Sequence, residues 1–331
     1  MTSGGSAARP RVVVLRALGL GDLCAAVPAL RAIRGAFPEH ELVLCTAAWQ
    51  APLARLAEVD RVSPTPALEP IAEREVAPDV AINLHGRGPQ STRRLIDLAP
   101  RRLIAYRHPV LPETEDGPRW SFDEHEVTRW CRLLEHFAIP ADPSAIELGP
   151  PEVTSPLPSG AVVVHPGAAA RGRRWPADRF AEVVERLVHL GERVVVTGEG
   201  GETGLAARVV ARVAAHESVT DLVGRTAIDE LCALVAGARA LISNDTGIAH
   251  VATAYRTPSV VLFGPTPPAR WGPRGGPHVT LWKGVTGDPH AAELHPGLAA
   301  ITVDEVMRAF ETVVDGAAMD RRGAGVLQRR G

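Results

Sequence analysis

The residues best suited to chemistry occur in three short segments, each of which directly follows a run of apolar residues. Asp22 closes the glycine-containing turn A-L-G-L-G-D. A histidine and two arginines belong to V-V-V-H-P-G-A-A-A-R-G-R-R-W-P, and N-D-T-G-I-A-H follows A-L-I-S. A carboxylate can act as a general base, whereas arginines and the free amides of a helix start bind anions. Together these types indicate a site for a diphosphate and sugar hydroxyls.

Asp22 has two compatible interpretations. As the N-cap of the helix that follows the turn, it would stabilise that helix by about 0.5 to 2 kcal/mol. As a general base on a glycine turn, it would contribute roughly 10² to 10⁴ in rate. We therefore name Asp22 as the candidate catalytic residue.

The candidate donor-binding residues lie in the second half of the chain. Arg173 precedes a helix start and is placed for a diphosphate, with a solvated basic loop as the alternative. Glu202 either contacts a ribose hydroxyl or only favours the helix dipole. Asp245 either binds sugar hydroxyls or caps a helix, and His250 is either structural or part of the site. The full set is His165, Gly167, Arg173, Arg174, Gly198, Glu202, Asn244, Asp245, Thr246, Gly247 and His250.

Several other phosphate-binding motifs are absent from the sequence. The first turn has Gly19 and Gly21 but carries Cys24 where a dinucleotide fingerprint needs its third glycine. The sole lysine, Lys283, lies in no P-loop, and no D-x-D holds a metal for a sugar nucleotide. We therefore expect no metal and no bound cofactor, with the sugar nucleotide acting as a co-substrate.

The elements that position these residues follow an alternating strand and helix pattern. In the first half we predict strands from Arg11 and at 41–45, 80–84 and 102–105, with helices at 49–57, 89–98 and 124–137. In the second half we predict strands at 161–164, 193–197, 218–222, 240–243 and 259–263, with helices at 177–190, 204–215, 228–236, 248–254 and 303–314. In open parallel sheets, ligands bind at the carboxyl ends of the strands, where all three segments lie.

The length of 331 residues favours two domains. A segment rich in proline, glycine and serine, Gly149 to Gly160, interrupts the pattern and predicts the linker. We therefore expect an α/β fold with two doubly wound Rossmann-like domains facing a central cleft. Residues 1–150 would form the acceptor-binding domain, 161–316 the donor-binding domain, and 317–331 a mobile tail.

Composition excludes several other classes of protein. The net charge of −2 gives no general attraction to nucleic acid or to an anionic membrane. There is no apolar run of about 18 residues and no signal-peptide pattern, so we expect a cytoplasmic protein without a membrane segment. Four scattered cysteines in apolar stretches are typical of reduced core residues.

In order and spacing these motifs resemble glycosyltransferase family 9, the heptosyltransferases. The similarity rests on G-L-G-D, H-P-G-A with a following basic residue and W-P, G-x-x-x-E, S-N-D-T-G-x-x-H-x-A-x-A, and L-F-G-P-T, between about Val12 and Pro273. The resemblance implies a GT-B fold, an ADP-heptose-like donor and inversion at the anomeric carbon without a metal. It also implies that Asp22 is the general base.

The resemblance further assigns the donor residues by motif position. Arg173 stands where the family usually has a diphosphate-binding lysine, a change that keeps the charge but alters its geometry. Glu202 would contact the ribose, and Asp245 the heptose hydroxyls. Thr246 and Gly247 would hold phosphate through their backbone amides.

Two acceptor classes remain open. Arg87, Arg93 and Arg94 would suit the anionic inner core of lipopolysaccharide. The loop L-P-E-T-E-D-G-P-R-W-S-F-D-E-H-E instead suits a small cationic acceptor, such as an aminocyclitol antibiotic precursor, and we favour this hypothesis. The acidic residues of this loop are Glu113, Glu115, Asp116, Asp123, Glu124 and Glu126.

Two other functions are compatible with parts of the pattern. An NAD-dependent oxidoreductase or nucleotide-sugar epimerase would use a similar sheet, but the third glycine and a Y-x-x-x-K pair are missing. A non-catalytic sugar-nucleotide binding module would keep Asp245 and Gly247 and would not need Asp22.

Overall fold

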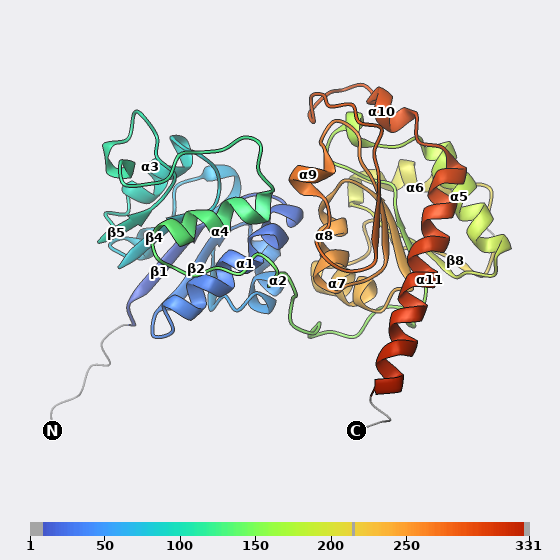
Figure 1. Cartoon of the computed structure of the whole chain (residues 1–331), viewed down its shortest axis with the longest axis horizontal. Helices are drawn as coiled ribbons and strands as arrows, with labels where there is room; N and C mark the ends of the chain where they lie inside the picture. Colours follow the sequence, from blue (N-terminus) through green and yellow to red (C-terminus); the bar gives the residue numbers. More distant parts are fainter. Residues whose placement is uncertain (1–8, 214–215, 328–331) are drawn as a thin grey trace. The chain divides into compact units, whose positions relative to one another are not determined.

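The structure, a computed structural model, describes residues 9–213 and 216–327 and divides into two compact units. The first unit is Met1–Gly149 and the second is Pro150–Gly331. The division lies at the start of the proline-rich segment. Each unit contains one parallel sheet flanked by helices (Figure 1).

The first unit is built around a five-stranded parallel sheet in the order β3-β2-β1-β4-β5. Its elements are β1 (Arg11–Leu15), α1 (Leu20–Ala36), β2 (Glu41–Thr46), η1 (Ala48–Gln50), α2 (Ala51–Leu56), β3 (Arg61–Pro64), η2 (Pro66–Leu68), η3 (Glu73–Glu75), β4 (Val80–Asn83), α3 (Gln90–Ile96), β5 (Arg102–Ile104), η4 (Pro112–Thr114) and α4 (Glu126–His136).

The central strands of this sheet are apolar because helices cover both faces. Val13 lies between Val43 and Ala81 on the neighbouring strands. These three side chains pack with Leu95 and Leu98, from α3 and the turn after it. Helices α1 and α4 pack against each other (Figure 1).

The second unit has a six-stranded parallel sheet in the order β11-β10-β9-β6-β7-β8. Its elements are β6 (Val162–His165), η5 (Arg171–Arg173), α5 (Ala177–His189), β7 (Val194–Val196), η6 (Gly200–Glu202), α6 (Thr203–Val210), β8 (Val219–Asp221), α7 (Ile228–Ala236), β9 (Ala240–Asn244), α8 (Gly247–Ala254), β10 (Ser259–Leu262), α9 (Pro268–Trp271), β11 (His278–Leu281), α10 (Pro296–Ala299) and α11 (Val303–Leu327).

Alternating residues of the second sheet form its main core. Val164 and Ile242, from β6 and β9, share one cluster with Phe180 of α5, Ala206 of α6 and Phe310 of α11. Figure 1 shows this side of the sheet covered by α5 and α11, with α7 and α8 on the other side. The amphipathic helices thus enclose the largely apolar central strands β6, β7, β9 and β10.

The structure departs from the predicted elements at several places, which include the unpredicted short helices α9 and α10. Strands β3 and β11 were not predicted, because R-V-S-P and H-V-T-L are short and half polar. In the structure, β3 pairs with β2 and β11 pairs with β10. Helix α11 continues to Leu327, beyond the predicted helix end at residue 314, and the mobile tail expected at 317–331 stays a prediction. Residues 328–331 lie outside the described ranges.

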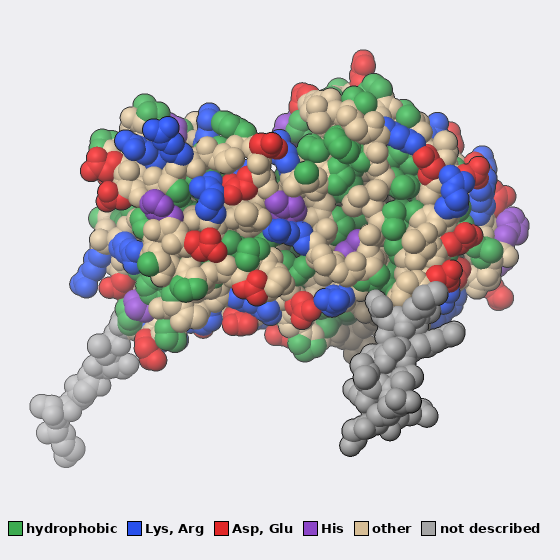
Figure 2. Space-filling view, in the orientation of Figure 1, with side chains coloured by type: hydrophobic (Ala, Val, Ile, Leu, Met, Phe, Trp, Pro, Cys, Tyr) green, Lys and Arg blue, Asp and Glu red, His purple; other side chains and the backbone are tan. Residues whose placement is uncertain are grey.

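The surface of each unit carries mixed charge. Figure 2 shows acidic and basic side chains interspersed on the face in view, without a large patch of one sign. In the two described ranges, no helix combines the length and the apolar composition needed to cross a membrane.

Candidate functional site

The first unit places its candidate base where the strand order reverses. Strands β1 and β4 are neighbours in the sheet. The next strand after β1 lies towards one edge of the sheet, and the next strand after β4 lies towards the other. Such a reversal leaves room for a ligand at the carboxyl ends of the two strands. Arg16 and Asp22 follow β1, and His85 follows β4.

Asp22 is the third residue of α1, and Gly19 is the N-cap. The expectation that Asp22 itself is the N-cap is therefore wrong, because the helix already begins at Leu20. Asp22 nevertheless stabilises the helix start, since its Oδ2 accepts a hydrogen bond of 3.2 Å from the Gly19 amide. Its Oδ1 lies 3.3 Å from a guanidinium nitrogen of Arg16. The side chain remains 27% exposed and is accessible to a substrate.

Arg16 is completely buried and connects three segments of the first unit. Its Nε donates to the carbonyl of Asp22 at 2.8 Å, and Nη1 donates to the carbonyl of Leu84. Nη2 also donates to Oε1 of Glu126 at 3.1 Å, and the guanidinium lies 4.8 Å from the ring centroid of Trp130. Sequence reasoning did not select Arg16, although an arginine directly after a continuous apolar strand was a usable signal.

Two acids of the expected cation-binding loop are already paired with arginines. Burial alone would raise the pKa of Glu126, but the charges of Arg16 and Arg129 hold it below its usual value. Glu124 receives hydrogen bonds of 2.7 and 3.0 Å from Arg132. These two carboxylates therefore serve the fold of the first unit, which removes part of the reason for expecting a cationic acceptor.

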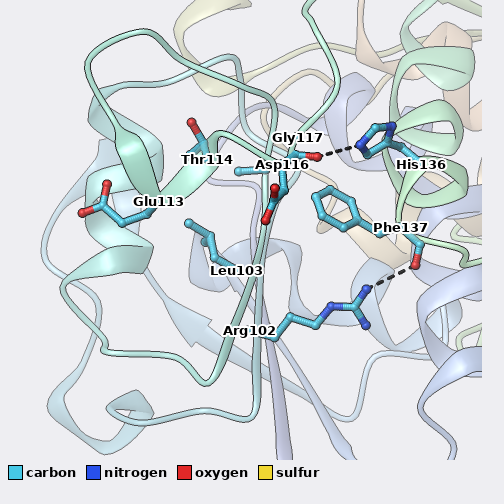
Figure 3. Close-up of a pocket in the computed structure, with 9 residues that line it drawn as sticks. Arg102, Leu103, Glu113, Thr114, Asp116, Gly117, His136 and Phe137 are labelled. Atoms are coloured by element: carbon cyan, nitrogen blue, oxygen red, sulfur yellow. Dashed lines mark hydrogen bonds between the residues drawn. The ribbon is translucent and has the colours of Figure 1, made fainter.

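Glu113 and Asp116 line a pocket of about 610 Å³ beside the edge strand β5. Figure 3 shows its other walls, among them Arg102 at the start of β5 and His136 and Phe137 at the end of α4. The ring nitrogen Nε2 of His136 lies 2.7 Å from the carbonyl oxygen of Asp116, and Arg102 donates to the carbonyl of Phe137 at 3.2 Å.

This pocket lies away from the carboxylate of Asp22. Glu126, at the first residue of α4, contacts the arginine that holds Asp22, whereas His136 is the last residue of α4. A helix rises about 1.5 Å per residue, so these two ends are about 15 Å apart. The structure thus does not gather the predicted acidic acceptor residues around Asp22.

The remaining acceptor candidates are dispersed. Arg87, in the loop after β4, stacks on the ring of the exposed Phe122 at 5.3 Å. Glu115 ends the short helix η4 and does not line the pocket. Arg94 donates through Nε to the carbonyl of Leu68 at 2.9 Å.

His85 is a second residue of this edge that sequence reasoning did not select. Its amide donates to Oδ1 of Asn83 at 2.9 Å. Burial, together with the charge of Arg16, lowers the pKa of His85 to about 4. The imidazole is therefore neutral near pH 7.

The second unit reverses its strand order between β6 and β9. Most of the predicted donor residues follow these two strands, whereas Gly198 and Glu202 follow β7. His165 ends β6, pairs with Ser243 of β9, and hydrogen-bonds through Nδ1 to Oγ1 of Thr197 at 3.0 Å. Burial lowers the pKa of His165 to about 4. The neutral imidazole orders the strand ends around the site.

Asn244, at the end of β9, hydrogen-bonds to the loop that follows β6. This fully buried residue accepts a hydrogen bond of 3.0 Å from the amide of Trp175 through Oδ1. Its Nδ2 donates to the carbonyl of Pro166 at 2.7 Å and lies 3.4 Å from that of Gly167. The loop after β6 is thus held in place by the last residue of β9.

Arg173 and Asp245 are brought together by this arrangement. Nη1 of Arg173 lies 3.4 Å from the carbonyl oxygen of Asp245 and 3.9 Å from its Oδ2. Asp245 is only 6% exposed, and burial raises its pKa to about 6, although Arg173 acts in the opposite direction. A buried carboxylate with one distant ion pair is suited to accept hydrogen bonds from hydroxyl groups.

Glu202 lies between two glycine turns. A Cβ at Gly167 would come within 2.1 Å of Oε2 of Glu202, and one at Gly198 within 3.0 Å of the same atom. Oε2 accepts a hydrogen bond of 3.0 Å from the Glu199 amide, and Oε1 lies 3.6 Å from Arg174. Gly167 is therefore needed to admit this carboxylate, whereas a Cβ at Gly198 would only crowd it.

Helix α8 begins at Gly247 with Thr246 as its N-cap, and the Thr246 side chain makes no capping hydrogen bond. The first amides of the helix are consequently placed to bind an anion. His250 lies one turn into α8, with its ring edge-on to Trp271 at 5.7 Å. This contact supports the structural interpretation of His250.

Residues 291–295, which sequence reasoning did not select, pack on the basic loop that contains Gly172. The amide of Gly172 donates to the carbonyl of Ala291 at 2.9 Å, and the amide of His295 donates to the carbonyl of Gly172 at 3.2 Å. A Cβ at Gly172 would come within 3.0 Å of the carbonyl oxygens of Ala291 and Glu293. The segment has no periodicity or motif that would have identified it.

Comparison with known proteins agrees with the motifs. Residues 118–293 match the model of glycosyltransferase family 9 (heptosyltransferase). Lipopolysaccharide heptosyltransferase 2 of Escherichia coli strain K12 is 29% identical over 157 residues, or 45% of either chain. In sequence, the chain therefore spans about half the length of this curated relative.

Solved structures resemble the chain over almost its whole length. The E. coli ADP-heptose lps heptosyltransferase II superposes with a TM-score of 0.76 at 19% identity, covering 93% of this chain and 99% of its own. The E. coli heptosyltransferase WaaC, solved with ADP, gives a TM-score of 0.69 at 18% identity, covering 92% and 99%. The predicted α/β fold class with two Rossmann-like domains, GT-B, is confirmed.

Proposed function

Because the chain belongs to glycosyltransferase family 9, we propose that it transfers a heptose or related sugar from an ADP-sugar to a hydroxyl of a cell-envelope glycan. The observation that carries this proposal is the arrangement at the strand reversal of the second unit. There, Arg173 and Arg174 lie beside the carboxylates of Asp245 and Glu202, next to the first amides of α8.

In the proposal, the second unit holds the donor. Arg173, Arg174 and the amides at Gly247 supply positive charge for a diphosphate. Asp245 accepts hydrogen bonds from the transferred sugar, and Glu202 from the ribose. ADP is the favoured nucleotide because a solved relative of the same fold was determined with ADP.

Asp22 is the proposed general base. As the acceptor hydroxyl attacks the anomeric carbon, its proton passes to the carboxylate of Asp22 and the bond from that carbon to the phosphate oxygen breaks. A single displacement of this kind inverts the anomeric configuration. The departing ADP carries the negative charge, which the arginines and amides stabilise without a metal ion.

We propose a glycan of the lipopolysaccharide-core type as the acceptor, in line with the name of the curated relative. The rival cationic aminocyclitol is not favoured, because Glu124 and Glu126 are paired with arginines. Glu113 and Asp116 line a separate pocket beside β5.

Calorimetric titration with ADP, UDP, GDP and NAD, each with and without EDTA, tests the donor. We expect ADP to bind most tightly and EDTA to leave its affinity unchanged. A preference for UDP or GDP would overturn the donor, selective NAD binding would overturn the transferase proposal, and sensitivity to EDTA would overturn metal independence.

Turnover of ADP-heptose with a deacylated inner-core glycan tests the reaction, and an aminocyclitol serves as the comparison acceptor. Asp22→Asn should retain ADP affinity and lose roughly 10² to 10⁴ in kcat, the usual contribution of a general base. Asp142→Asn, at an exposed position of the same unit, is the matched control and should turn over like wild type. Unchanged turnover in Asp22→Asn would exclude Asp22 as the base.

A further inference from the structure

Arg16 makes two contacts with Asp22 in addition to the contacts that join the strands and helices of the first unit. Its guanidinium binds both the carbonyl oxygen and the carboxylate of Asp22, at 2.8 and 3.3 Å. The bond to Leu84 and the bond to Glu126 would already join β1 to the end of β4 and to α4. The additional contacts fix the first turn of α1, on which the carboxylate stands.

Glu126 prevents Arg16 from turning away. Oε1 of Glu126, which binds Arg16, also accepts from Nε1 of Trp130 at 2.9 Å, and Oε2 accepts from Arg129. The indole of Trp130 covers one face of the Arg16 guanidinium. Glu126, which binds Arg16, is therefore itself held by two buried groups, Trp130 and Arg129.

The charges at this position balance. Arg16 and Arg129 are opposed by Asp22 and Glu126, while the nearby His85 is neutral near pH 7 because its pKa is about 4. Burying ions is costly, and an apolar cluster of equal volume often stabilises a fold as well or better. A fully buried arginine in contact with an accessible carboxylate thus points to a role beyond stability.

We propose that Arg16 is a positioning residue for the reaction: it holds the Asp22 carboxylate, together with the Gly19 amide, in the orientation that accepts the proton of the acceptor hydroxyl. With Oδ1 bound to Arg16 and Oδ2 to Gly19, rotation about the side-chain bonds is blocked. This inference rests on the proposed function, in which Asp22 is the base.

The test uses the double variant Arg16→Gln/Glu126→Gln in the full chain, so that no buried carboxylate is left without its partner. Misplacement of a catalytic group by about 1 Å can cost about 10²-fold in rate. We therefore expect kcat to fall about 10- to 100-fold, with the donor KM and the ADP affinity within about threefold of wild type. Arg16→Lys keeps the charge without the planar fork and should give an intermediate kcat.

A second readout does not depend on turnover. The Gly19 amide donates to the Asp22 carboxylate. Release of the carboxylate in the double variant should therefore raise the hydrogen-exchange rate of the Gly19 amide at least about tenfold. Arg61→Gln/Glu75→Gln is the matched control, since Arg61 at the start of β3 binds the buried Glu75 at 2.7 Å. This control should leave both the Gly19 amide and kcat unchanged.

The outcomes separate the two proposals. A folded double variant with wild-type kcat and a protected Gly19 amide would overturn the positioning role, as would an equal loss of kcat in the Arg61 control. A wild-type protein that shows no transfer would overturn the proposed function, and an unchanged Gly19 amide in the double variant would then also overturn the role of Arg16.

Discussion

Replacing Asp245 by asparagine should change how the stability of the second unit depends on pH. Burial raises the pKa of Asp245 from 3.8 to about 6. Because the native pKa lies above the unfolded value, the folded state favours the protonated acid. The contribution of Asp245 to the stability of the folded state is complete below about pH 4 and is lost as the pH rises through about 6.

The size of the effect follows from the shift. Each pKa unit corresponds to about 1.36 kcal/mol, so about two units give a loss of about 3 kcal/mol between pH 4 and pH 7. Asp245→Asn has no charge to bury and escapes this loss. The free energy of unfolding of the variant minus that of wild type should therefore increase by up to about 3 kcal/mol over this range.

Urea denaturation at pH 4 to 8, followed by tryptophan fluorescence, measures this difference. Hydrogen exchange of the β6 and β9 amides reports the second unit separately. Histidine titrations are common to both proteins and cancel in the comparison. Asp315→Asn, on the exposed side of α11, controls for the loss of one negative charge. A difference that stays flat with pH, or that decreases, would refute the reasoning.

Three further predictions concern the same unit. Gly167→Ala should displace the Glu202 carboxylate and weaken ADP binding by about tenfold or more in calorimetry, whereas Gly204→Ala, with open space around its Cα, should bind ADP normally. His165, whose pKa burial lowers to about 4, should stay neutral from pH 8 to 5.5 in a nitrogen NMR titration; an inflection near pH 6.5 would contradict this. By the same sign rule, its contribution to stability is present above about pH 6.5 and is lost as the pH falls through about 4. Asn244→Ala should lower the free energy of unfolding by about 2 to 4 kcal/mol in urea denaturation, because it leaves two buried loop groups without partners; a loss below 1 kcal/mol would contradict this.

Much of the architecture was readable from the chain. Runs such as V-V-V-L and A-L-I-S predict buried parallel strands because continuous apolar residues need cover on both faces. The same logic placed Asp22 and Asp245 at the carboxyl ends of strands, where the structure has them. Local pattern suffices here, since Asp245 directly follows β9 and Asp22 lies in the first turn of the helix that comes after β1.

Only the tertiary structure decided which of these residues meet. The pairing of Arg173 with Asp245 joins positions 72 residues apart, and that of Arg16 with Glu126 joins positions 110 apart. No local periodicity encodes such contacts, because they depend on the strand order. The acidic loop was misread because its sequence does not show which carboxylates are paired: Glu124 binds Arg132, and Glu126 binds both the nearby Arg129 and the distant Arg16.

Local pattern in the chain therefore predicted the fold class, the strand ends and the chemistry available at each of them. The tertiary structure decided whether each charged side chain is accessible, paired or buried, as with Asp22, Glu126 and Asp245. The physical reason is that local sequence sets the backbone pattern and the face of each residue. The electrostatic environment is instead the sum of groups that strand order brings together from distant parts of the chain.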